Sequence, residues 1–124
     1  MNIDRSEIYE SFAAAFQCLE IEALSRVLAD HGITDSAIRQ KICGDFIAAS
    51  AAMLDRGWIR EDGAVVHPVL CFAKGSAPLG AITAPASLLL PSQEFSFEEY
   101  VGGNLYHFFE EKRENLSDLE RGFV

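Results

Sequence analysis

Apolar side chains recur at intervals of three and four residues in the first quarter of the chain, the spacing of one helix face. A first stripe comprises Ile8, Phe12, Phe16 and Leu19, and a second comprises Ile21, Leu24 and Leu28. The second stripe is displaced by about 130° around a straight helix. One rigid helix would then need two opposed apolar faces, so the pattern predicts two helices within residues 4–30. We place their break near residues 18–20, a capping box of Asp4 and Glu7 at the start, and Gly32 at the end.

The next stripe predicts the most regular helix of the chain. Thr34 or Asp35 supplies a polar N-cap, and Gly57 follows the last helical residue, Arg56. The side chains expected to face the core share helical spacing; they are Ile38, Ile42, Phe46, Ala49 and Met53.

From Trp58 onward the pattern predicts strands. Residues 58–60 and 64–72 form a hairpin with Asp62-Gly63 at its turn. Pro68 places the second strand at an edge or a bulge, because proline has no N–H to donate. Further strands are expected near residues 79–83 and 87–90. Residues 63–93 carry one charge, on Lys74, which allows two interpretations: buried strands, or an exposed apolar patch that forms a dimer interface or a ligand cleft.

Two interpretations also fit residues 94–109. Ser96 and Glu99 have capping-box spacing, Gly102-Gly103 can close a short helix, and Asn104 can cap a second one. Alternatively, the alternation around Phe97 and a turn at Gly102-Gly103 would give a hairpin. We prefer the helices.

Together these elements predict an α+β fold: three N-terminal helices packed on a small, mainly antiparallel sheet, with a C-terminal helical segment. The 124 residues, 49% hydrophobic and 23% charged, are typical of one globular domain spanning residues 1–124. Residues 9–16 and 21–30 resemble the opening helix pair of NTF2-like, SnoaL-type domains. The resemblance implies a curved antiparallel sheet over helices, with a pocket for apolar ligands or for isomerase or hydrolase chemistry. The helices followed by Gly57-Trp58-Ile59 and a hairpin resemble a winged helix.

Charge and cysteine content narrow the class of protein. The net charge is −9, from 19 acidic and 10 basic residues, so we expect no nucleic-acid partner, because the chain would repel phosphates. Cys18, Cys43 and Cys71 are odd in number and widely spaced, as is typical of reduced thiols in a cytoplasmic protein. The sequence shows no signal peptide and no uninterrupted apolar run, so we expect no membrane partner.

The sequence contains no metal or cofactor motif. His67 and Cys71 would lie about 13 Å apart on an extended strand, whereas zinc ligands lie about 2.0–2.3 Å from the metal. The glycines of residues 75–80 lack the Lys-Ser/Thr of a phosphate loop. We therefore expect no metal and no cofactor, while a cysteine–histidine nucleophile pair stays undecided.

The sequence favours a non-enzymatic acidic interaction protein, either immunity-like or inhibitor-like with a basic partner, or self-associating as a homodimer. Its candidate partner-binding residues are Glu110, Glu111 and Glu114. The alternative is an NTF2-like pocket protein, with a winged-helix module as a further possibility. Candidate ligand-binding residues, chosen by residue type, are Asp45, Trp58, His67 and Tyr106. Asp45 could instead form an ion pair with Lys41, one turn earlier.

Overall fold

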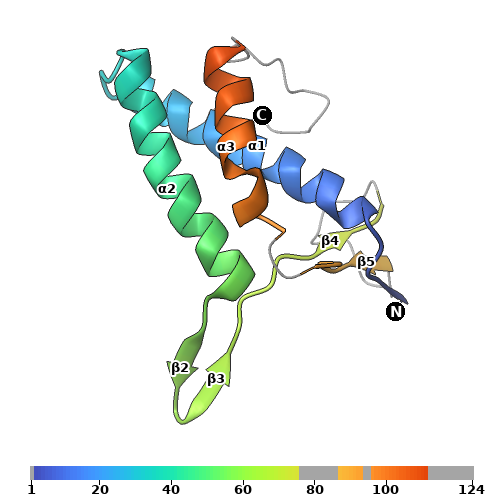
Figure 1. Ribbon diagram of the computed structural model, residues 1–124. Coiled ribbons are helices and arrows are strands. Elements are labelled where there is room, and N and C mark those ends of the chain that lie inside the picture. Colours follow the sequence, from blue (N-terminus) through green and yellow to red (C-terminus); the bar gives the residue numbers. More distant parts are fainter. Residues whose placement is uncertain (1, 76–86, 94–95, 112–124) are drawn as a thin grey trace.

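The computed structural model describes residues 2–75, 87–93 and 96–111 and confirms the mixture of helices and strands. Two long helices form most of the molecule (Figure 1): α1, Ile8–Asp30, and α2, Ser36–Arg56. A C-terminal helical segment packs on both of them. It consists of a 3-10 turn, η2 (Glu98–Tyr100), the short helix α3 (Val101–Leu105) and a π-helical turn, η3 (Tyr106–Glu110).

The predicted break within residues 4–30 is wrong, because α1 is a single helix. Of the first apolar stripe, Ile8 and Phe12 are exposed. The second stripe does face the core, because Ile21 is buried and Leu24 and Leu28 pack against its cluster. The buried residues combine apolar and polar types; they are Tyr9, Ala13, Gln17, Cys18, Ile21, Glu22 and Ser25. Hydrogen bonds make burial of the polar members tolerable: the Gln17 amide, for example, donates to the Phe97 carbonyl at 3.0 Å.

The two ends of α1 differ in how well the sequence predicts them. Asp4 belongs to strand β1 and accepts a hydrogen bond from the Ser6 N–H, while Glu7 occupies the N-cap without a side-chain bond. The predicted capping box is therefore wrong. Gly32 follows the C-cap residue His31 with a φ of 90°, as predicted for a residue that ends a helix.

The bounds of α2 are confirmed, but its predicted core face is wrong. Asp35 caps the helix by accepting the Ile38 N–H at 3.0 Å, and Gly57 follows its last residue. A different set of residues is buried; it comprises Arg39, Cys43, Ile47 and Ala51. α3 packs beside this side, and a Cβ on Gly44 would make an ordinary van der Waals contact with Leu105 Cδ1 at 3.4 Å. The predicted stripe, with Ile38, Phe46 and Met53, faces outward.

The C-terminal segment confirms the helical interpretation, and the alternative hairpin is wrong. The predicted break at Gly102-Gly103 is also wrong, because both glycines lie inside α3. Asp55 of α2 supplies the cap at the start of η2 by accepting hydrogen bonds from the Phe97 and Glu98 backbone N–H groups. Ser96 donates its hydroxyl to Glu10 instead of capping this segment.

The strands are short and form two separate sheets. The hairpin of β2 (Ile59–Glu61) and β3 (Ala64–Val66) is confirmed, with positive φ at Asp62 and Gly63 as its two-residue turn requires. β1 (Asn2–Asp4) pairs in parallel with β5 (Ser87–Leu89), which pairs antiparallel with β4 (Phe72–Ala73). The predicted strand 64–72 is divided around Pro68, whereas β5 matches the one expected near 87–90. The strand expected at 79–83 lies outside the described residues.

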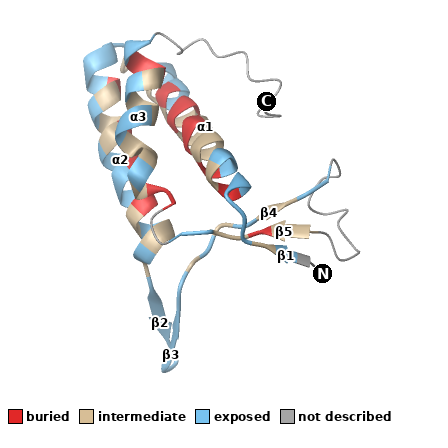
Figure 2. Ribbon diagram, turned by 45° about the vertical axis from the view of Figure 1, so that its right-hand side comes forward, coloured by how far each residue is buried: buried red, intermediate tan, exposed pale blue. Residues whose placement is uncertain are grey.

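Two clusters of buried side chains hold these elements together. One contains Tyr9, Ala13, Ala51, Leu89 and Phe97 and joins α1 and α2 to β5. The other contains Ile21, Cys43, Ile47, Phe108 and Phe109 and joins both helices to η3. Within the described ranges, no residue of β2 or β3 belongs to either cluster, and the hairpin projects beyond the end of α2 with every strand residue exposed (Figure 2).

The structure differs from the architectures that the two resemblances imply. The residues that resemble the NTF2-like helix pair form one helix, and the described strands are two or three residues long. The hairpin does follow a helix, as in a winged helix, but α2 extends over 21 residues. No described helix is long and apolar enough to cross a membrane.

Candidate protein-binding surface

The outer face of α2 exposes large apolar side chains. Ile38 and Phe46 are each 52% exposed and Met53 is 60% exposed, although all three have the spacing of a core-facing stripe. The opposite side of the helix contributes Ile47 and Ala51 to the two cores. A helix that is apolar on both sides is typical of one that is covered on both sides.

This apolar face continues from α2 onto the hairpin. A surface hollow of about 540 Å³ lies where they meet, and its lining includes Met53, Trp58 and Ile59. Trp58 is 61% exposed, and the apolar strand residues of the hairpin are exposed with it. We call this region the α2–hairpin surface, comprising Ile38, Phe46 and Met53 on α2 and Trp58, Ile59, Val65 and Val66 on the two faces of the hairpin.

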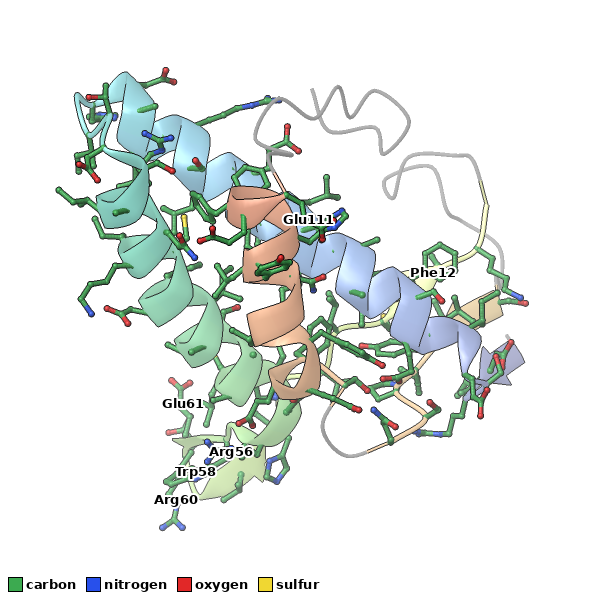
Figure 3. The ribbon with its side chains drawn as sticks, turned by 45° about the horizontal axis from the view of Figure 1, so that its top comes forward. Phe12, Arg56, Trp58, Arg60, Glu61 and Glu111 are labelled. Carbon is green, nitrogen blue, oxygen red and sulfur yellow. The ribbon has the colours of Figure 1, made fainter. Side chains whose placement is uncertain are left out.

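Strand pairing divides the hairpin residues between two faces. Ile59 lies opposite Val66, so their side chains share one face. Arg60 lies opposite Val65 on the other face, and its guanidinium lies 5.9 Å from the centre of the Trp58 ring. Both faces therefore present apolar groups, and the hairpin offers them away from the helices (Figure 3).

Local contacts hold the base of the hairpin at the end of α2. Gly57 is required there, because a Cβ on this residue would lie 2.5 Å from the Met53 carbonyl oxygen. The Gly57 carbonyl lies 2.9 Å from His67 Nδ1, and this contact joins the two ends of the hairpin. The direction in which the hairpin projects is thus set by residues 53–67.

The charges around the α2–hairpin surface are of both signs. Lys41 and Asp45 form an exposed ion pair at 3.7 Å on α2. Arg56 pairs with Glu98 at 2.7 Å, and Arg60 and Glu61 lie next to each other on β2. The surface consequently has an apolar centre with a mixed-charge border, the usual composition of a protein–protein interface.

The predicted ligand-binding residues are not gathered around one cavity. His67 borders one hollow and Trp58 another, and the linings of these two hollows include neither Asp45 nor Tyr106. Asp45 forms the ion pair with Lys41 that the sequence analysis gave as its alternative role. Tyr106 is exposed on η3. Of the four, the structure places Trp58 on the α2–hairpin surface.

The hollow that His67 borders has a volume of about 400 Å³ and is also lined by Arg5 and Asp55. Burial raises the pKa of Asp55 above its usual value, but both of its carboxylate oxygens already accept backbone hydrogen bonds from Phe97 and Glu98. The Arg5 guanidinium donates to the Pro91 carbonyl. Sequence reasoning missed Asp55 because its partners lie more than 40 residues away in the chain, beyond any local capping pattern.

The predicted acidic partner-binding residues lie apart from the hairpin. Glu110 and Glu111 are exposed at the end of η3, where Glu111 pairs with His107 at 3.1 Å. Glu114 lies outside the described residues. Figure 3 shows Glu111 well apart from the hairpin residues Trp58 and Arg60. These acids and the α2–hairpin surface therefore do not form one continuous patch.

The cysteines have different surroundings. Cys18 and Cys43 are buried, and Cys43 Sγ lies 3.9 Å from the Ile21 carbonyl oxygen. Cys71 is exposed. In the part of the chain that the structure describes, no group of three or more His, Cys, Asp or Glu residues is arranged to hold a metal ion.

Comparisons with known proteins gave no match: no protein-family model fits the sequence, no curated protein is significantly similar to it, and no solved structure matches its fold.

Proposed function

We propose that this chain is a non-enzymatic protein-binding module whose binding site is the α2–hairpin surface. The observation that carries the proposal is the outward apolar face of α2, which continues through Met53 onto Trp58 and Ile59. Exposing such groups to water is unfavourable, and burying them against a partner would remove that cost.

The size of the surface suits a specific complex. Its large apolar side chains, each about half exposed, amount to several hundred Å², on the order of the 800 Å² that each partner buries in a standard interface. The tryptophan beside Arg56 and Arg60 adds the residue types that most often dominate binding energy.

Two observations favour this function over a ligand pocket and over a purely acidic docking site. The Arg5, Asp55 and His67 side chains that line the hollow beside His67 are engaged in hydrogen bonds to the backbone. A basic partner held by Glu110 and Glu111 would lie away from the apolar hairpin, and Glu111 already has His107 as a hydrogen-bond partner.

Site-specific photo-crosslinking in intact cells tests the proposal. A photoreactive phenylalanine analogue replaces Phe46 in one variant and Phe12 in a matched control, because both aromatic side chains are about half exposed. Phe12 lies on α1, away from the hairpin. We expect a covalent protein adduct from position 46 and none from position 12. No adduct from position 46, or equal adducts from both positions, would reject the α2–hairpin surface as a binding site.

A further inference from the structure

We propose that the protein bound at the α2–hairpin surface is a second copy of this chain, joined by antiparallel pairing of β3 with β3 of the other copy. This inference rests on the proposed function and specifies the partner. It assigns a role to a hairpin that contributes to neither core cluster of the described chain and projects from the helices.

The two edges of the hairpin differ in how well they are protected against pairing. β2 carries Arg60 and Glu61, and charged side chains on an edge strand oppose pairing with another strand. β3 consists of Ala64, Val65 and Val66, all exposed and uncharged. β3 pairs with β2 alone among the described strands, so its other edge is unpaired within that part of the chain and has the composition that favours strand addition.

The geometry of the turn identifies Val65 as the centre of the pairing. In a hairpin with a two-residue loop, the residues that flank the loop direct their N–H and C=O groups toward each other. Glu61 and Ala64 hold these positions. Val65, the next residue of β3, therefore directs its backbone N–H and C=O away from β2, toward the open edge.

If a two-fold axis passes through Val65, its backbone N–H and C=O can hydrogen bond with the C=O and N–H of Val65 in the second copy. Val65 then lies opposite Val65 of the second copy, and Ala64 lies opposite Val66, so every opposed pair is apolar. The same axis applied to β2 would oppose Arg60 with Arg60 or Glu61 with Glu61, and like charges directly opposite each other destabilise a sheet. Self-pairing through β3 is thus the compatible arrangement.

Pairing also removes the main weakness of the hairpin. An isolated two-stranded hairpin is marginally stable in water, whereas three or more strands with an apolar face can be stable. The dimer would contain a four-stranded sheet in the order β2, β3, β3, β2, with Ile59 and Val66 of both copies on one face. The two-fold symmetry matches the commonest form of homo-oligomer.

Opposite charges at position 65 provide the test. Val65→Lys and Val65→Glu each place like charges against their own copy, so we expect each purified variant alone to be monomeric, with self-association weakened at least tenfold. An equimolar mixture should recover a dimer containing one copy of each, because the introduced ammonium of one variant would then oppose the introduced carboxylate of the other. Multi-angle light scattering over a range of concentrations measures the mass. Val27→Lys on exposed α1 is the control that should remain dimeric, as the unmodified chain does.

Several outcomes would overturn the inference: a monomeric unmodified chain at all concentrations, a dimeric Val65→Lys variant, or a mixture that stays monomeric. Circular dichroism checks that both variants retain the helices, which are remote from this exposed position. The crosslinked adduct from position 46 separates the two proposals. A dimer-sized adduct agrees with both, whereas an adduct to a different protein from a monomeric chain supports the binding surface and rejects the second copy.

Discussion

At the residue scale, polar side chains between the elements connect segments that are distant in sequence. Glu20 on α1 accepts a hydrogen bond from the Ser50 hydroxyl on α2 at 3.0 Å. Gln17 links α1 to the C-terminal segment through the Phe97 carbonyl and through Asn104, whose amide donates to Gln17 Oε1 at 2.8 Å. Such bonds contribute little net stability, but a missing partner leaves a buried polar group unsatisfied at a cost of about 1–3 kcal/mol.

Glu20 gives a prediction for the dependence of stability on pH. Burial raises the pKa of its carboxyl above the usual 4.5, and the Ser50 hydrogen bond opposes this only in part. A carboxyl with a higher pKa in the folded chain than in the unfolded chain binds protons more tightly when folded. Its favourable contribution is therefore complete below pH 4.5, the ordinary pKa, and is lost as the pH rises through the folded-state pKa.

We expect Glu20→Gln to remove this contribution. As the pH falls from about 7 toward about 4.5, the free energy of unfolding of the unmodified chain should rise relative to that of the variant. Urea denaturation at several pH values measures both free energies. If the free energy of unfolding of the unmodified chain instead falls relative to that of Glu20→Gln as the pH falls, the raised pKa of Glu20 is contradicted.

At the element scale, α2 shows how much the sequence predicts and where it stops. The ends of α2 were predictable because Asp35 and Gly57 act on the nearest turn of the helix. Its core face was not, because Ile38, Phe46 and Met53 have helical spacing and so do the residues that are buried. Periodicity shows that a helix face can be buried, but it does not show which segment of the chain, or which other protein, packs against that face.

Two alanine substitutions distinguish the faces of α2. Ile47→Ala should lower the free energy of unfolding by about 2–5 kcal/mol, because Ile47 is fully buried and its removal leaves a cavity. Phe46→Ala, at the adjacent exposed position, should change it by less than about 0.5 kcal/mol. Both are measured by urea denaturation in the Val65→Lys background, which isolates the monomer. A larger loss for Phe46→Ala would mean that the outward stripe is the core face.

The C-terminal segment was predicted as helical but not as continuous. Gly102 and Gly103 are typical of a helix end, yet both lie within α3. The signal that starts this segment comes from Asp55 on α2, across the fold. A local pattern could not reveal that cap, and the local capping residue, Ser96, bonds to Glu10 instead.

At the scale of the whole molecule, a helical body carries a hairpin that adds nothing to its core clusters in the described chain (Figure 2). The mixed fold class followed from the change of pattern at Trp58. The exposed position of the hairpin could not be predicted, because an apolar strand has the same sequence whether its own chain or another protein covers it. The α2 stripe, which was expected to face the core, and the hairpin, for which an exposed patch was one of two interpretations, together form the proposed binding surface.

The measurement that tests this account most directly is hydrogen exchange at the backbone amides of β3, residues 64–66, because in the dimer each of them is hydrogen bonded either to β2 or to the second copy. It compares the unmodified chain at high concentration with the monomeric Val65→Lys variant. We predict slow exchange at these amides in the unmodified chain, fast exchange in the variant, and equal exchange in the α1–α2 core of both. Equally fast exchange of the hairpin in both samples would contradict the claim that a second copy covers it.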